Sequence, residues 1–472
     1  MKTRLITLCA TALIALGALT PIGESIADGV AHVVKTITRQ ADPVEKVELL
    51  FPVNGETVDI LKPTVVNYID AMHTQAEPIE DDQVLHDFYV MAPDTNNRYY
   101  GETFTNETDL VRIADYASQS QYMQKSKSVM LTFVAEGHVP SKVKVSTNQD
   151  MSDAQELTDI AATDYAYYVG VNQLYSNRTY YWQVFEGDTA ISEVASFKTA
   201  EGFRMISTNT VANVRDMGGR TVHLKTGVDP VTGKNVYNTK HIKQGLIFRG
   251  GELVEESYTP EGSGQHSATL QTGDAEFFVE DLGIGLEIDL RGDEESQNIT
   301  ESPLKSYYEH NYSQVVDVNY MRLANISAYD DFFSITSSKP YYSNIKTMFQ
   351  DFANAENRHV YFHCWGGADR TGTVGFLLGA LLGMSLTDLI IDYELTSFSC
   401  NYRPHDSNDA KKVYRFPSML KRIQTMTVHG DSSTTYWSED KPISQIIEEI
   451  LIDRFEVTSE DIAALRANLL ED

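Results

Sequence analysis

The sequence predicts two folded domains in series: an all-β domain over 44–200 and an α/β domain over 201–472, with a central, mainly parallel sheet flanked by helices. Two patterns carry this prediction. Up to about residue 199, apolar and polar residues alternate with the period of β-strands, whereas after 200 short apolar strands alternate with segments of helical spacing. With 42% hydrophobic residues, the composition is typical of a globular chain and excludes a disordered or fibrous protein.

The charge of the chain limits its partners. A total of 38 Lys and Arg against 67 Asp and Glu gives a formal net charge of −29. Such a surface repels phosphate backbones, which excludes non-specific binding of nucleic acid. An anionic substrate therefore needs a locally built cationic pocket.

Residues 1–27 have the pattern of a secretory signal peptide. Two basic residues precede an apolar run at 5–19, which is shorter than the roughly 20 residues that a membrane-spanning helix needs. Small residues precede a cleavage site after Ala27; an uncleaved N-terminal anchor is the alternative. We therefore expect an exported protein, secreted or held in the cell envelope, without stable membrane insertion after cleavage, and with a polar linker at 28–43.

The β domain contains one specific strand pattern. Strands are expected at 128–133, 142–146, 165–171, 180–184 and 194–198. Leu174, Tyr180, Trp182 and Val184 fall on one face of a period-2 strand, which resembles the sixth strand of a fibronectin type III domain with Tyr180 as the corner tyrosine. The resemblance implies a sandwich with an insertion at 75–125, which serves as a spacer or binds a surface partner. An unrelated β-sandwich is the alternative.

The α/β domain shows strands and helices in alternation. Strands are expected at 246–249, 286–290 and 359–363, and helices at 342–353, 372–382, 386–397, 443–455 and 459–470. Thr458 and Asp461 form a capping pattern at the start of the last helix. The alternation of strands and helices predicts one domain over 201–472.

The most informative segment is 359–374, which reads strand, tight loop, helix. Cys364 is followed by five residues and then Arg370. Gly366 and Gly367 allow successive amides to turn inward as an anion-binding nest, and the helix that follows adds the positive end of its dipole. Arg370 completes the cradle, because its rigid fork can hold two oxygens of a phosphate.

The same positive field favours the thiolate of Cys364 as a nucleophile. His363 can hold the loop by hydrogen bonding, and Thr371 is placed to donate its hydroxyl to the sulfur when a phosphocysteine is hydrolysed. Trp365 and Ala368 complete the loop around the phosphate. A plain structural turn and a degenerate, non-catalytic phosphate binder are the alternatives.

The string His-Cys-x-x-Gly-x-Asp-Arg-Thr-Gly resembles the loop of bacterial protein tyrosine phosphatases of the secreted, atypical kind that also act on phosphoinositides. Other segments agree with that family in order. They are Asn-Val-Arg-Asp-Met-Gly-Gly at 213–219, Phe-Arg-Gly-Gly at 248–251, Ile-Asp-Leu-Arg at 288–291 and Asp-Tyr-Glu-Leu-Thr at 392–396. The resemblance covers about 205–472 and implies a cysteine-phosphatase fold. Ala368 stands where many relatives have lysine, which weakens the case for highly phosphorylated inositols.

A general acid must protonate the leaving oxygen. The resemblance points to Asp369, in the loop itself. Asp289 is the second candidate, because it ends a parallel strand at the edge where α/β sheets bind ligands. The structural alternatives are a loop-stiffening carboxylate for Asp369 and a salt bridge to Arg291 for Asp289. Arg215, which we assign to substrate binding, and Arg249 and Arg291 could attract phosphate or form structural ion pairs.

We therefore expect an exported, cysteine-dependent phosphatase that acts on phosphotyrosine. A phosphoinositide phosphatase is one alternative, and an adhesion or scaffold protein with a dead phosphate-binding domain is another. The 12 histidines show no metal-ligand spacing, and no cofactor is expected. Cys400 is either a buried thiol or the partner of Cys364 in a regulatory disulfide.

Overall fold

The computed structural model describes residues 47–76, 126–253, 270, 272–292, 299–324, 326–333, 339–399, 415–438 and 441–472. The predicted signal peptide, the linker at 28–43, most of the predicted insertion and Cys400 lie outside the described residues. The chain divides into two compact units, one within Met1–Lys62 and Ser126–Gly202, the other within Pro63–Lys125 and Phe203–Asp472. Every helix in the described ranges is too short or too polar to cross a lipid bilayer.

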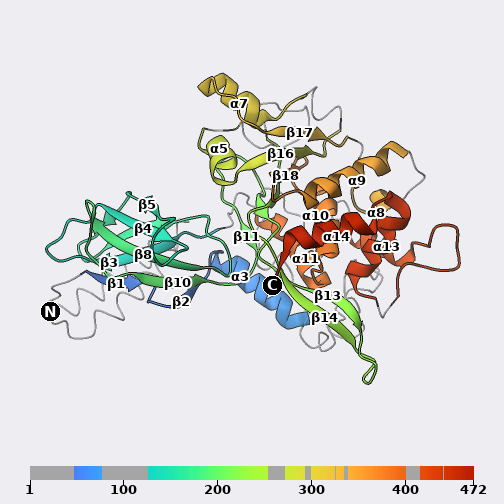
Figure 1. Ribbon diagram of the computed structural model, residues 1–472, viewed down its shortest axis with the longest axis horizontal. Helices are drawn as coiled ribbons and strands as arrows, with labels where there is room; N and C mark the ends of the chain where they lie inside the picture. The colour runs from blue at the N-terminus through green and yellow to red at the C-terminus, as the bar shows by residue number, and fades with distance from the viewer. Residues whose placement is uncertain are drawn as a thin grey trace. The chain divides into compact units, whose positions relative to one another are not determined.

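The first unit consists of two β-sheets (Figure 1). Its strands are β1 (Glu48–Phe51), β2 (Glu56–Val58), β3 (Val129–Val134), β4 (Lys142–Ser146), β5 (Gln155–Leu157), β6 (Ala161–Ala162), β7 (Tyr167–Val171), β8 (Thr179–Glu186), β9 (Thr189–Ala190) and β10 (Ala195–Thr199). One sheet has the order β1-β3-β7-β6; the other has the order β2-β10-β8-β4-β5, with β9 paired to β8. The strands predicted from the alternating pattern are confirmed as β3, β4, β7, β8 and β10.

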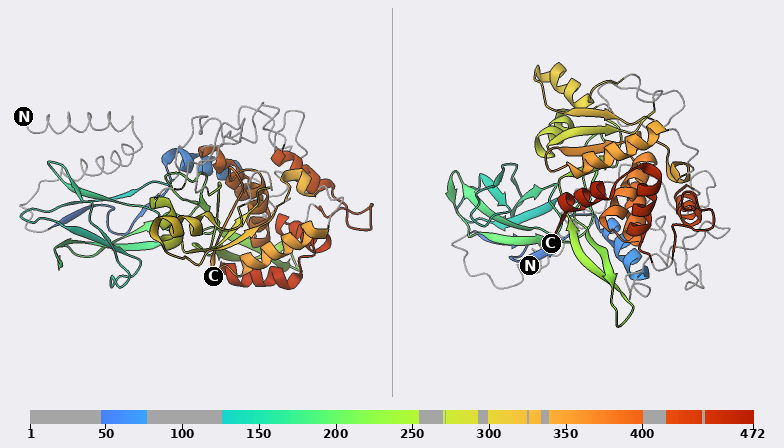
Figure 2. Two further views of the ribbon diagram at one scale, coloured as in Figure 1. Left: turned by 90° about the horizontal axis from the view of Figure 1, so that it is seen from above. Right: turned by 45° about the vertical axis from the view of Figure 1, so that its right-hand side comes forward.

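Figure 2 shows the strands of the two sheets from two further directions. Aromatic side chains pack between the sheets. The ring of Phe133 on β3 lies 6.5 Å from the ring of Trp182 on β8, and both side chains are fully buried. The hydroxyl of Tyr180 accepts a hydrogen bond from the backbone N–H of Tyr175 at 2.9 Å. A corner tyrosine of a β-sandwich makes this kind of bond back to the preceding loop.

Between 47 and 199 the helix signal is weak and β-type segments dominate, yet residues 63–76 form the helix α3 (Pro63–Ala76), which was not predicted. Its signals were present: a proline at the first helical position and apolar residues at helical spacing, which are the buried Val65, Tyr68, Ile69 and Met72. Although 63–76 falls in the range predicted for the β domain, the helix belongs to the second unit. There His73 Nε2 lies 2.9 Å from Asp388 Oδ1.

The second unit contains a six-stranded sheet in the order β11-β12-β15-β18-β16-β17. Its strands are β11 (Arg204–Met205), β12 (Arg215–Asp216), β15 (Ile247–Gly250), β16 (Ile284–Asp289), β17 (Asn319–Arg322) and β18 (His359–His363). The pairs β15·β18, β18·β16 and β16·β17 are parallel, whereas β11 and β12 add an antiparallel edge. The predicted mainly parallel sheet is therefore observed. The hairpin of β13 (Thr221–Val228) and β14 (Asn235–Ile242), with β19 (Leu470–Glu471), forms a separate small sheet that was not predicted.

The helices of this unit that the sequence predicted are all present. They are α9 (Lys339–Ala353), α10 (Arg370–Leu382), α11 (Leu386–Glu394) with the 3₁₀ turn η5 (Leu395–Phe398), α13 (Ile443–Phe455) and α14 (Ser459–Leu469). The capping box at α14 is confirmed, because Asp461 N–H donates to Thr458 Oγ1 and Thr458 N–H to Asp461 Oδ2. Besides α3, the helical segments of this unit that were not predicted are α5 (Thr272–Glu276), η4 (Phe277–Asp281), α7 (Pro303–Tyr312), α8 (Tyr329–Phe333) and α12 (Arg415–Thr425).

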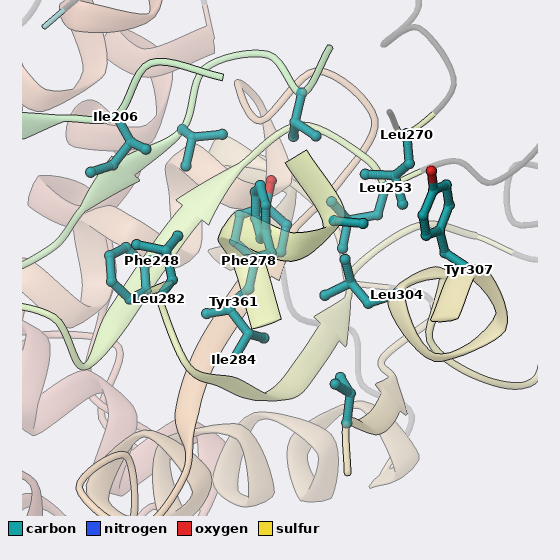
Figure 3. Close-up of a cluster of buried hydrophobic side chains, with 14 of the residues drawn as sticks. Ile206, Phe248, Leu253, Leu270, Phe278, Leu282, Ile284, Leu304, Tyr307 and Tyr361 are labelled. Carbon is teal, nitrogen blue, oxygen red and sulfur yellow. The ribbon is translucent and has the colours of Figure 1, made fainter. Parts of the chain in front are cut away.

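Hydrophobic side chains cover both faces of the six-stranded sheet. On one face, Phe248, Ile284 and Tyr361 join a buried cluster with side chains from η4 and α7 (Figure 3). On the other, the ring of Phe362 lies 5.3 Å from that of Phe352 on α9. With both faces covered, the carboxyl ends of β15, β16 and β18 remain the natural place for a ligand.

Candidate active site

Cys364 follows directly after β18, at the carboxyl edge of the sheet, and α10 begins with Arg370. The predicted sequence of strand, tight loop and helix is therefore confirmed. The neighbouring parallel strands β15 and β16 end at Gly250 and Asp289, beside the same edge. The thiol is free, and only 3% of Cys364 is exposed.

The backbone carbonyls of the loop are held by groups outside it. The carbonyl of Trp365 accepts from the N–H of Glu252 at 3.0 Å. The carbonyls of Gly366 and Gly367 accept from the side-chain amide of Asn213 at 3.3 and 3.0 Å. Three successive peptide oxygens are thus tied to the surrounding protein.

These bonds set the direction of the loop amides. Because the C=O and the following N–H of a peptide unit point to opposite sides, the amides of 366–368 face the inner side of the loop. The N-terminus of α10 lies at the end of the same loop. The arrangement builds a site for an anion from backbone dipoles, in a chain whose net charge is strongly negative.

Gly367 is required by both conformation and space. Its φ is +67°, a left-handed value that side chains disfavour. A Cβ atom there would lie 2.5 Å from the carbonyl carbon and oxygen of Gly250. The loop can therefore approach the end of β15 only with glycine at this position.

Arg215, which the sequence assigned to substrate binding, and Arg249 brace the loop from outside. Both side chains are buried, and Arg215 Nε donates to Asp392 Oδ1 at 3.0 Å. Arg249 pairs with the other oxygen of Asp392, and its Nη2 donates to the carbonyl of Gly367 at 3.0 Å. Burial acts to raise the pKa of Asp392, but the charges of Arg215 and Arg249 outweigh it and lower that pKa. Of the two roles that the sequence left open for these arginines, attraction of phosphate or a structural ion pair, the geometry supports the ion pair.

His363 anchors the base of the loop. Its Nδ1–H donates to the carbonyl of Cys364 at 3.0 Å, which is the loop contact that the sequence predicted. Its Nε2 lies 2.9 Å from Glu287 Oε1, and both side chains are fully buried. Burial lowers the pKa of His363, but the carboxylates of Asp289 and Glu287 reverse this and raise it. An imidazolium can then donate to both partners.

Asp289, the second candidate for the general acid, has the contacts of a structural carboxylate. Its Oδ2 accepts from Arg291 Nη2 at 2.7 Å and from the hydroxyl of Tyr320 at 2.9 Å, and its Oδ1 accepts from Arg291 Nε at 2.9 Å. Burial acts to raise the pKa of Asp289, but the charges of His363 and Arg291 lower it to about 2. Asp289 is therefore ionised near neutral pH and bound on both oxygens, as in the salt-bridge alternative. Arg291 also binds Glu252 Oε2 at 2.8 Å, which makes it structural too.

The remaining predicted residues surround the loop mouth. Arg370 and Asp369 are half-buried, and Arg370 Nη1 donates to the carbonyl of Leu290 at 3.2 Å. Asp369 Oδ1 accepts from the hydroxyl of Tyr329 at 2.8 Å. Thr371 is fully buried, and its hydroxyl has no hydrogen-bond partner among the described residues. A buried donor at the start of α10 suits the hydroxyl-to-sulfur role predicted for Thr371. Trp365 is half-buried and Ala368 buried.

Sequence reasoning missed several residues that hold the site: Asn213 as a loop anchor, Glu287, Asp392 as an ion-pair hub, and Tyr329. Asn213 has a left-handed φ of 61°, which its sequence position did not reveal. Glu287 left a signal, because it is a charged residue inside the apolar strand β16. Within the described ranges, no three His, Cys, Asp or Glu side chains gather closely enough to form a metal site.

Comparison with known proteins places the same segment in one family. The profile of the tyrosine phosphatase family matches residues 206–471, which is more than half of the chain and contains the whole site. A tyrosine-protein phosphatase of Nostoc commune is 27% identical over 136 residues. This match covers 27% of the chain and 45% of the relative, so the chain spans less than half the length of that protein.

Proposed function

Because the chain belongs to the tyrosine phosphatase family, we propose that it hydrolyses phosphate monoesters through a phosphocysteine on Cys364. The observation that carries the proposal is the loop between β18 and α10. Its carbonyls are tied outward, its amides face inward, and a buried free thiol lies at its base. This arrangement suits a phosphoryl group held against a sulfur nucleophile.

The reaction is proposed to run in two displacements. The Cys364 thiolate attacks phosphorus, and the bond to the ester oxygen breaks while Asp369 gives that oxygen a proton. Water then attacks the phosphocysteine, Asp369 takes a proton from the water, and the S–P bond breaks to release inorganic phosphate. The hydroxyl of Thr371 donates to the departing sulfur. Arg370 holds the equatorial oxygens in both steps.

The proposed substrate is phosphotyrosine. Initial rates on a phosphotyrosine peptide, its phosphoserine counterpart and a phosphoinositide, measured side by side by phosphate release, test this choice. We expect kcat/KM for the phosphotyrosine peptide to exceed that for the phosphoserine peptide by about 10²-fold, since an aryl oxygen is the better leaving group. A phosphoinositide rate above the phosphotyrosine rate would identify a lipid phosphatase instead.

Asp369 is proposed as the general acid, since Asp289 is ionised and bound on both oxygens. We expect Asp369→Asn to lower kcat/KM, which reports the first displacement, for a simple alkyl phosphate by about 10²-fold or more, and for a nitro-substituted aryl phosphate much less. Good leaving groups need little protonation. Asp289→Asn serves as the control and should slow both substrates by the same factor. A leaving-group dependence in Asp289→Asn, with a uniform loss in Asp369→Asn, would exchange the two roles.

The first unit is proposed as a fibronectin type III-like spacer or binding module in an exported protein. Its two-sheet architecture and the bond from Tyr175 N–H to the Tyr180 hydroxyl support the likeness. The sequence of 1–27 supports export.

A further inference from the structure

We propose that Tyr329 is a positioning residue that fixes the carboxyl group of Asp369, so that one oxygen is anchored and the other carries the proton for the leaving group. The inference rests on the proposed function, in which Asp369 is the general acid. Neither the loop motif nor its flanking segments point to Tyr329, which lies on the separate short helix α8.

Tyr329 binds the start of α10 at two points. Its hydroxyl donates to Asp369 Oδ1 at 2.8 Å, and its backbone N–H donates to Thr373 Oγ1 at 2.8 Å. Thr373 N–H in turn donates to the backbone carbonyl of Asp369 at 2.9 Å. These bonds close a ring in which the backbone and the side chain of Asp369 are tied to the same tyrosine.

The tyrosine itself is held rigidly. It is only 2% exposed, and its φ of 56° is a left-handed value that a bulky residue adopts only where its surroundings impose it. Its ring meets that of Tyr393 edge-on at 6.2 Å, and Tyr393 stacks on Phe416 at 4.4 Å. Further along α8, Phe332 stacks on Phe455 at 4.8 Å. The hydroxyl therefore has a fixed position from which to orient a carboxylate.

The side chain of Asp369 is diverted from its ordinary role. It occupies the N-cap of α10, where an aspartate usually accepts hydrogen bonds from the first helical amides, yet it makes no capping bond. Burial raises the pKa of the Tyr329 hydroxyl well above 10, so the hydroxyl is a donor throughout the neutral range. Since Oδ1 accepts from this donor, the geometry assigns the transferable proton to Oδ2.

The test compares two substrates on each enzyme preparation. Tyr329→Phe keeps the ring and removes the donor. We expect kcat/KM for a simple alkyl phosphate to fall about tenfold, the effect of losing one hydrogen bond. The value of kcat/KM for a nitro-substituted aryl phosphate should fall less than about twofold. Because both rates come from one preparation, any loss of folded protein cancels from their ratio.

A matched control exists in the same unit. The hydroxyl of Tyr320 donates to Asp289 Oδ2 at 2.9 Å. This is also a bond from a tyrosine to an aspartate, but it does not involve the proposed acid, Asp369. Tyr320→Phe should leave the ratio of the two rates as in the wild type. A changed ratio in Tyr320→Phe would place the acid at Asp289 and overturn the inference.

A double variant separates positioning from packing. In an Asp369→Asn background, Tyr329→Phe should not lower kcat/KM further, because the carboxyl group that the tyrosine orients has already been replaced by an amide. A further loss there, or an equal loss on both substrates in the single variant, would make Tyr329 a merely structural residue. If the loss depends on the leaving group in Asp369→Asn but not in Tyr329→Phe, the inference is wrong while the proposed phosphatase activity is unaffected. Full activity in Cys364→Ser would contradict the proposed cysteine-dependent phosphatase function.

Discussion

Replacing Cys364 by serine should lower kcat on an aryl phosphate by about 10⁴-fold or more, because an alcohol in place of the thiolate is a far weaker nucleophile at neutral pH. The substitution exchanges one small atom in a loop whose shape is fixed by Asn213, Arg249 and Glu252. A phosphotyrosine peptide should therefore still bind. Phosphate release measures the first effect, and titration calorimetry on the variant measures the second.

Two controls accompany this variant. The wild-type rate should be the same with and without EDTA, since the proposed nucleophile is a side chain. Cys364→Ala, which has no nucleophile at all, should match Cys364→Ser. Substantial turnover by Cys364→Ser, or a complete loss of wild-type activity on chelation, contradicts the proposed chemistry.

Arg370→Lys should lower kcat/KM by about 10²–10³-fold, although the charge is kept. The guanidinium can bind two oxygens of the phosphoryl group in one plane, whereas an ammonium is a point charge on a flexible stem. Arg370 is also oriented by its bond to the carbonyl of Leu290 at the end of the neighbouring strand β16. Steady-state kinetics on a phosphotyrosine peptide measure the change.

Arg466→Lys is the matched control for this substitution. Arg466 Nε also donates to a backbone carbonyl, that of Leu381 at 2.8 Å, but at the far end of α10. Its replacement should leave kcat/KM within about twofold of the wild type. If Arg370→Lys retains most of its kcat/KM, the side chain does not grip the phosphoryl group through two bonds.

The loop that contains Cys364 and Arg370 could be predicted from the sequence because its motif is local. Cys364, Arg370 and Thr371 lie in one short segment, and the strand before and the helix after them have strong patterns of their own. The mainly parallel sheet followed from the same alternation of strands and helices. The helix α3 was missed because the β-type segments around it dominated the pattern.

What holds the loop could not be read in the same way, because it depends on contacts between distant segments. The flanking motif segments could be recognised, but nothing in them shows that Asn213 and Arg249 grip the carbonyl of Gly367. For Asp289, the sequence left a salt bridge to Arg291 and an acid as alternatives, and the bond from Tyr320, which favours the structural role, comes from a distant segment. A tertiary contact decides each of these roles.

The most direct test of the account is to trap the phosphocysteine. Asp369→Asn should form it quickly from a ³²P-labelled, nitro-substituted aryl phosphate and hydrolyse it slowly, because the second step lacks its base. Rapid acid quenching and peptide mapping should then show a burst of label on the peptide that contains Cys364, and none when Cys364→Ser is added. Turnover without label on that peptide would contradict the mechanism. Binding of phosphate with neither label nor turnover in the wild type would show a phosphate-reading domain instead of an enzyme.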